Sequence, residues 1–127
     1  VPNFIYQALS GTALTVYGDG KQTRSFCYVD DLVNGIVKLL HSRVRTPINL
    51  GNPHEITIME LAETINKMAN NMAGTVFTEG RTRSDPQQRQ PDITRAEELL
   101  RWKPCISLQK GLQGTIAFYK DKLAAHK

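Results

Sequence analysis

The sequence predicts an α/β fold, because strand-like stretches alternate with amphipathic helical patterns along most of its 127 residues. Short runs of β-branched, aromatic or other apolar side chains predict strands at residues 14–17, 25–29, 47–51 and 75–78. Apolar residues spaced three and four apart predict helices at residues 1–9, 29–40, 58–72, 93–100 and 108–123. Alternation of this kind favours parallel pairing within one thin sheet.

The helix at residues 29–40 has the clearest pattern. One face of it carries Val29, Leu32, Val33, Ile36, Val37 and Leu40. Asp30 and Asp31 stand at its start, where carboxylates accept hydrogen bonds from free N–H groups, so capping is favoured over catalysis for both. Thr57 and Glu60 have the spacing of a capping box, and Ser107 is expected to cap the last helix.

Composition narrows the possible ligands. The apolar fraction of 40% and the charged fraction of 22% are typical of one globular domain. The net charge is +4, but Lys and Arg are scattered without a run of five, which favours a phosphorylated small molecule over nucleic acid. Cys27 and Cys105 are expected to be buried free thiols, and the three histidines lack metal-ligand spacing, so no metal is expected.

The first candidate site lies in the stretch LTVYGDGKQTRSFCYVDD at residues 14–31. Gly18 and Gly20 predict a tight turn, since glycine readily adopts the positive φ that such turns need. The turn brings Tyr17 close to Lys21 and Arg24, and an aromatic beside cations suits a ligand with a flat ring and phosphates. The alternative for Tyr17 is a strand aromatic packed in the core.

The partner stretch is DPQQRQPD, at residues 85–92, within a polar loop expected from residue 79 to residue 91. Pro86 and Pro91 restrict the backbone around Arg89. Arginine carries a planar fork of donors that binds phosphate or carboxylate with two hydrogen bonds. We therefore expect the fold to bring Arg24 and Arg89 to one anionic group, the alternative being two solvated surface arginines.

Asp92 has two interpretations: it caps the helix that follows, or it accepts hydrogen bonds from ribose hydroxyls. No Ser/His/Asp or Cys/His arrangement is visible, and Gly18 and Gly20 have no third glycine to complete a Gly-x-Gly-x-x-Gly fingerprint. The residues by themselves indicate an anion-binding half-site.

Three stretches, LTVYGDGKQTRSFCYVDDLVNGI, INLGNPHEITIMELAE and DPQQRQPDITRAEELLRWKP, closely resemble the C-terminal part of the UDP-glucuronate decarboxylases, or UDP-xylose synthases. That family belongs to the extended short-chain dehydrogenases/reductases. The similarity covers essentially the whole chain. It implies Rossmann-type sheet elements plus a small substrate-binding domain, with residues 1–127 forming the C-terminal substrate-binding portion.

The resemblance also implies a reaction. Family members bind NAD on an N-terminal Rossmann domain, which this chain lacks together with the catalytic Tyr-x-x-x-Lys pair. NAD⁺ oxidises C4 of UDP-glucuronate, the β-keto acid loses CO₂, and NADH reduces the ketone to give UDP-xylose. The fragment alone is therefore expected to be inactive.

By the same resemblance, five residues belong to the substrate site. Thr15 and Tyr17 line the uracil pocket, and Asp92 lies near the ribose. Arg24 and Arg89 bind the diphosphate or neighbouring sugar groups, and Arg89 is also a candidate catalytic proton donor.

Alternatives remain open. One is a nucleotide-sugar epimerase or 4,6-dehydratase of the same superfamily, and another is a non-catalytic basic nucleotide-binding module. The chain opens without an initiator methionine and inside a helical pattern, so we expect a piece of a longer protein, with an unpaired sheet edge and an exposed apolar face. The family pairs as homodimers and includes cytoplasmic members and members anchored in the Golgi lumen, which leaves both compartments open.

Overall fold

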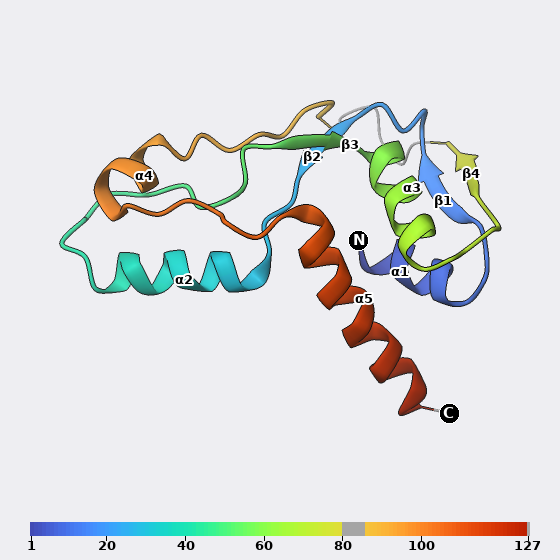
Figure 1. Cartoon of the computed structure of the whole chain (residues 1–127). Helices are drawn as coiled ribbons and strands as arrows, with labels where there is room; N and C mark the ends of the chain where they lie inside the picture. The colour runs from blue at the N-terminus through green and yellow to red at the C-terminus, as the bar shows by residue number, and fades with distance from the viewer. Residues whose placement is uncertain (80–85, 127) are drawn as a thin grey trace.

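The computed structural model describes residues 1–79 and 86–126 (Figure 1). Within those ranges the chain forms five helices and four strands. In chain order they are α1 (Pro2–Leu9), β1 (Leu14–Tyr17), β2 (Thr23–Ser25), α2 (Val29–Leu40), β3 (Glu55–Thr57), α3 (Ile58–Met68), β4 (Thr75–Thr78), α4 (Thr94–Leu100) and α5 (Leu108–Ala124). The loop expected from residue 79 to residue 91 lies partly outside the described residues.

The α/β prediction is confirmed, but the strands form two small sheets instead of one. β1 and β4 pair in parallel, with Leu14 opposite Thr75. β2 and β3 pair antiparallel, with Arg24 opposite Ile56, which the sequence did not predict. Figure 1 shows α2 and α4 at one end of the molecule, and the β1–β4 pair with α1 and α3 at the other.

Three predicted boundaries are wrong. The strand expected at residues 25–29 lies at Thr23–Ser25, and residues 47–51 form no strand, because within the described ranges no strand pairs with them. The partner of β2 is instead Glu55–Thr57, of which the sequence patterns assigned only Thr57, as a helix cap. Helix α3 ends at Met68, before Gly74, since the chain turns at Asn70 with φ 53°.

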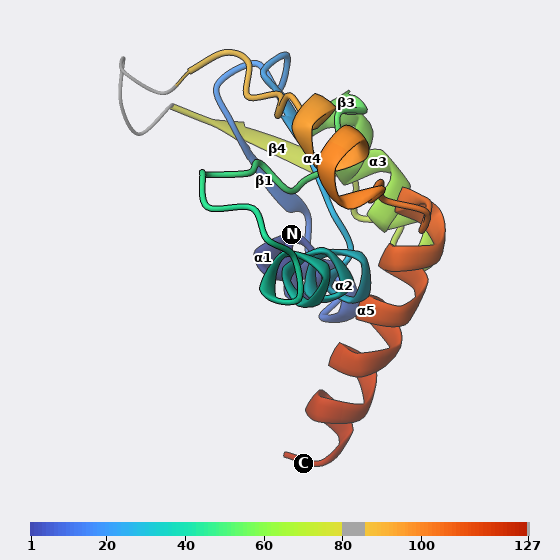
Figure 2. The same cartoon turned by 90° about the vertical axis from the view of Figure 1, so that its left-hand side faces the viewer.

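The larger core lies where α1, α3 and α5 meet β1. It is built from Ile5, Ala8, Leu14, Val16, Leu61, Ala62, Ile65, Leu112 and Ile116. Two predicted caps fix the helices around it. The Thr57 hydroxyl accepts from the Glu60 N–H at 3.1 Å while Glu60 accepts from the Thr57 N–H at 2.7 Å, and the Ser107 hydroxyl accepts from the Lys110 N–H. Figure 2 shows α5 continuing past this core, with its C-terminal end away from the other elements.

The smaller core surrounds Trp102, whose exposed fraction is 1%. Trp102 packs with Ile93, Ala96 and Leu100. Its ring lies so close to α2 that a Cβ on Gly35 would be 2.9 Å from Cε2, and its Nε1–H donates to the Asp31 carbonyl at 2.9 Å.

Neither Asp30 nor Asp31 caps α2, because the N-cap is Tyr28 and no side-chain cap hydrogen bond is present, so that prediction is wrong. Asp31 instead faces the interior. Its carboxylate is buried, with 4% exposed, and accepts hydrogen bonds from the N–H groups of Cys105 and Ile106 at 3.0 and 2.9 Å and from the Cys105 thiol at 3.1 Å. Helical geometry explains this, since Asp31 and Gly35 stand four residues apart on the face that meets Trp102. Cys27 and Cys105 are both free thiols, but Cys105 is exposed, not buried as expected.

Helix α2 consequently buries the face that carries Asp31 and Gly35 and exposes most of its apolar stripe. Leu40 is 76% exposed, and four more residues of the stripe are between 44% and 58% exposed. These four are Val29, Val33, Ile36 and Val37. The expected exposed apolar face is thus confirmed, within the part of the chain that the structure describes.

Replacing Asp31 with alanine should lower the free energy of unfolding by about 3 kcal/mol, because the backbone N–H groups of Cys105 and Ile106 lose a buried carboxylate acceptor. Chemical denaturation measures the effect. Asp30→Ala is the matched control, since Asp30 is exposed on the same turn and should change stability by less than about 0.5 kcal/mol. Equal effects of the two substitutions would contradict the structural role of Asp31.

Candidate functional site

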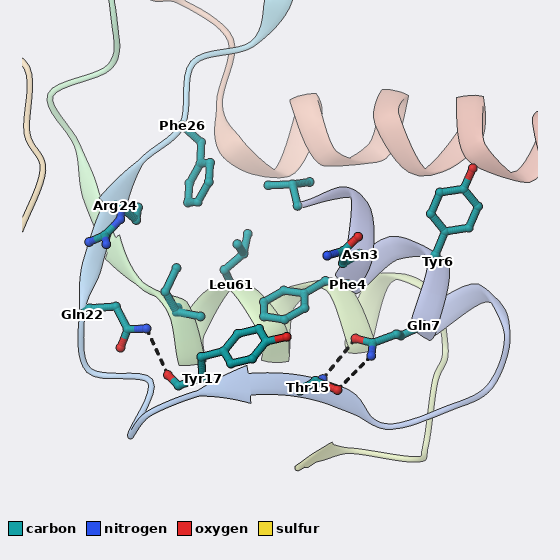
Figure 3. A pocket seen from close by; sticks show the side chains of 12 residues that line it. Asn3, Phe4, Tyr6, Gln7, Thr15, Tyr17, Gln22, Arg24, Phe26 and Leu61 are labelled. Carbon is teal, nitrogen blue, oxygen red and sulfur yellow. Dashed lines mark hydrogen bonds between the residues drawn. The ribbon is translucent and has the colours of Figure 1, made fainter. Parts of the chain in front are cut away.

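An open hollow of about 660 Å³ lies between β1, α1 and the chain that leads into β2 (Figure 3). Three of the predicted site residues, Thr15, Tyr17 and Arg24, line it. Its wall is completed by Asn3, Phe4, Tyr6, Gln7, Gln22 and Phe26, among others. Four aromatic side chains and an arginine therefore line one solvent-accessible space.

The alternation of β1 explains how Thr15 and Tyr17 reach the hollow. Leu14 and Val16 are fully buried, so the residues between and after them point to the opposite face of the strand. Tyr17 is 38% exposed, which excludes the alternative of a core aromatic.

Side chains from outside the strand fix both positions. Gln7 on α1 donates through Nε2 to the Thr15 hydroxyl at 2.9 Å and accepts from the Thr15 N–H at 3.1 Å. Gln22 donates to the Tyr17 carbonyl at 3.1 Å. The intervening turn depends on Gly18 and Gly20, which have φ values of 71° and 74°.

Arg24 belongs to this hollow and to a second one. The second hollow, about 600 Å³, is lined by both Arg24 and Arg89, with Asn52, Leu50 and Gly51 nearby. The fold brings the two arginines together, as expected, because both line this second hollow.

The backbone of residues 87–89 lies along β2, and this placement explains how Arg89 reaches Arg24. The Thr23 N–H donates to the Gln87 carbonyl at 2.8 Å, and the Ser25 hydroxyl donates to the Arg89 carbonyl at 3.2 Å. The loop therefore lies along the edge of β2 that does not pair with β3. Arg24 itself donates through one guanidinium N–H to the Thr23 carbonyl at 2.7 Å.

Asp92 lies just beyond this loop and is not among the described residues that line either hollow. One carboxylate oxygen accepts from the Thr94 N–H at 3.0 Å and from the Thr94 hydroxyl at 2.6 Å. These hydrogen bonds hold the pKa of Asp92 below its ordinary value. Asp92 therefore makes local hydrogen bonds at the residue before the N-cap, Ile93, and α4 has no side-chain cap hydrogen bond, so the capping interpretation is wrong.

The chemistry available at this site is that of binding. Among residues 1–79 and 86–126 we find no group of three or more histidine, cysteine or acidic side chains that could hold a metal ion. No helix in the same ranges is long and apolar enough to span a membrane.

Gly18 and Gly20 lie in a turn between two strands, not at the start of a helix, so these two glycines do not form a cradle for the pyrophosphate of NAD.

Sequence reasoning missed the contribution of α1 to the site. Gln7 orients Thr15, and Asn3, Phe4 and Tyr6 line the same hollow. The sequence signal for this region was the amphipathic pattern of the first helix. Such a pattern predicts a buried face, but it does not predict which residues the opposite face contacts.

Two arginines and several aromatics line adjoining hollows of an α/β fold, an arrangement that suits a phosphorylated, ring-containing ligand. The chain belongs to the family described as GDP-mannose 4,6 dehydratase, whose pattern matches residues 1–115.

Curated relatives are closely similar. The chain is 49% identical over 123 residues to UDP-glucuronic acid decarboxylase 1 of Danio rerio, with 97% of this chain and 29% of that protein covered. It is 47% identical over its whole length to UDP-glucuronic acid decarboxylase 5 of Arabidopsis thaliana, 37% of which is covered. The chain thus spans about a third of the length of these relatives.

Solved structures share the fold. An epimerase from Methanothermobacter thermautotrophicus superposes with a TM-score of 0.93 at 31% identity, over 98% of this chain and 38% of that one. The UDP-glucuronic acid 4-epimerase of Bacillus cereus, in complex with UDP-glucuronic acid and NAD, superposes with a TM-score of 0.86 at 31% identity, over 94% and 39%. The predicted fold class, part of an extended short-chain dehydrogenase/reductase, is confirmed by these neighbours.

The lowered pKa of Asp92 predicts a pH-dependent contribution to stability. Because the folded state favours the ionised carboxyl, the contribution is fully present above the ordinary pKa of about 3.9 and is lost as pH falls through the lowered folded value. The stability difference between the wild type and Asp92→Asn should therefore shrink as pH falls below about 4. Urea denaturation at several pH values measures it. Thr94→Val, which removes one donor, should reduce the pH dependence, whereas a difference that is constant with pH would contradict the assignment.

Proposed function

We propose that this chain is the UDP-sugar-binding portion of an NAD-dependent UDP-glucuronate decarboxylase, which converts UDP-glucuronate to UDP-xylose and CO₂. The observation that carries the proposal is the pair of hollows that meet at Arg24, with Thr15 and Tyr17 in one and Arg89 in the other. Identity of nearly one half to UDP-glucuronic acid decarboxylases supports this substrate.

Each residue has a role that its placement allows. Tyr17 offers an exposed ring for the face of uracil, and Thr15 a hydroxyl beside it. Arg24 and Arg89 offer two guanidinium groups for the diphosphate, whose charge they offset with directional hydrogen bonds. Arg89 lies in a loop next to the second hollow, so it is also the candidate proton donor to the sugar. Asp92 is proposed to stand near the ribose.

NAD enters the proposal as a cofactor held by a part of the longer protein outside these residues. The described glycines do not fit its pyrophosphate, so no role toward NAD is given to this chain. Pairing as a homodimer is proposed from the family resemblance.

The main alternative is a 4-epimerase acting on the same nucleotide sugar. Its support is the close superposition on the UDP-glucuronic acid 4-epimerase of Bacillus cereus. A non-catalytic basic module lacks comparable support, because the family match extends over residues 1–115.

The test uses the full-length protein that carries this chain. Incubated with UDP-glucuronate and NAD, it should release CO₂ and form UDP-xylose, with the product identified by mass spectrometry. Formation of UDP-galacturonate without release of CO₂ would show an epimerase and would overturn the decarboxylase proposal. Absence of both turnover and UDP binding would refute the proposal.

Arg24→Lys should raise the KM for UDP-glucuronate by about tenfold, since lysine keeps the charge but not the fork of donors. Steady-state kinetics of the full-length protein measure this. Arg43→Lys is the matched control, because Arg43 is exposed in the segment after α2 and lines neither hollow within the described residues. An unchanged KM and kcat in Arg24→Lys would remove Arg24 from the diphosphate site.

A further inference from the structure

Each residue from 87 to 91 is held to the β2–β3 pair or to the segment before it. The Gln87 and Arg89 carbonyls accept from the Thr23 N–H and the Ser25 hydroxyl. Gln90 donates to the Pro53 carbonyl at 2.9 Å, and Pro91 covers Gly51 so closely that a Cβ there would be 2.9 Å from its ring. The position of Arg89 is thus set by its neighbours in the chain.

Gln88 differs from its neighbours in the loop, because its side chain donates a hydrogen bond to a carboxylate. Gln88 donates through Nε2 to one oxygen of Glu55 at 2.9 Å. The other Glu55 oxygen accepts from the Thr23 hydroxyl at 2.9 Å. The Glu55 side chain therefore joins β2 to the loop, because one of its oxygens accepts from Thr23 and the other from Gln88. Hydrogen bonds to a carboxylate acceptor are stronger than those between neutral groups.

The register places Glu55 outside the binding surface. Glu55 stands opposite Ser25, and Arg24 stands opposite Ile56. Neighbouring residues of a strand point to opposite faces, so Glu55 and Arg24 lie on different faces of the pair. Glu55 is not among the described residues that line either hollow, so any effect it has on the ligand must pass through the loop.

We infer that Glu55 is a positioning residue for Arg89. Its two carboxylate oxygens accept from Gln88 and Thr23, and these hydrogen bonds hold the loop along β2. The loop in turn places the Arg89 guanidinium at the hollow that Arg24 also lines. This inference rests on the proposed function, since it takes the ligand of that hollow to be a nucleoside diphosphate. The carboxylate contributes to affinity without touching the ligand.

The experiment measures UDP affinity by calorimetry in the full-length protein, together with hydrogen exchange of a peptide covering residues 21–26, which contains the Thr23 N–H that donates to the Gln87 carbonyl. Glu55→Ala should weaken UDP binding about fivefold to tenfold and accelerate exchange of that peptide. Glu55→Gln keeps one carbonyl acceptor and should restore part of the affinity. Glu63→Ala is the control, because it removes an exposed carboxylate from α3 and should change neither readout.

A double-mutant cycle separates positioning from a general structural effect. In an Arg89→Ala background, Glu55→Ala should cause no further loss of UDP affinity, because the group that it positions is gone. A loss that persists in that background overturns the inference, as does Glu55→Ala with wild-type exchange and wild-type affinity.

The same measurements distinguish failure of the inference from failure of the proposed function. If UDP binds but Arg89→Ala does not weaken it, the positioning role is overturned, while the UDP site stands on Tyr17 and Arg24. If the wild-type protein binds no UDP, the proposed function fails, and the inference fails with it.

Discussion

The site depends on the pairing of β2 along both of its edges. On one edge β2 pairs with β3, and on the other the Thr23 N–H donates to the Gln87 carbonyl. This second bond joins residues that are 64 positions apart in the chain. It holds a proline-bounded loop along the edge of the two-stranded sheet, so the arginine that the loop carries is placed by backbone geometry.

A second constraint fixes the end of the molecule that carries α2 and α4. The buried Asp31 carboxylate accepts two backbone N–H groups from the segment before α5, and Trp102 packs on Gly35. Because Cys27 lies near Asp31, burial and that negative charge raise the pKa of its thiol. The chain entering α2 from β2 is therefore held at both ends, by β3 before it and by the Asp31 contacts after it.

Local patterns predicted what local forces determine. The strand at Leu14–Tyr17 and the capping box of Thr57 and Glu60 were predicted because alternation and capping act over a few residues. The role of Asp31 was missed because its partners lie 74 and 75 residues further along the chain. Residues 47–51 were predicted as a strand from composition, yet a strand also needs a partner, and the described part of the chain offers none.

The placement of the predicted site residues divides in the same way between local and distant contacts. Tyr17 and Arg24 flank one turn, so their proximity follows from the glycines between them. The approach of Arg89 was expected from the chemistry of the two arginines and the prolines around Arg89, because no local rule connects segments so far apart in the chain. The shared position of Arg24 has a further consequence under the proposed function. A nucleotide sugar is ring, diphosphate and sugar in linear order. Arg24 and Phe26 line both hollows, and Arg24 is the charged residue of the two, with Tyr17 in one hollow and Arg89 in the other. The diphosphate then belongs at the junction, which directs uracil toward Tyr17 and the reacting sugar toward Arg89.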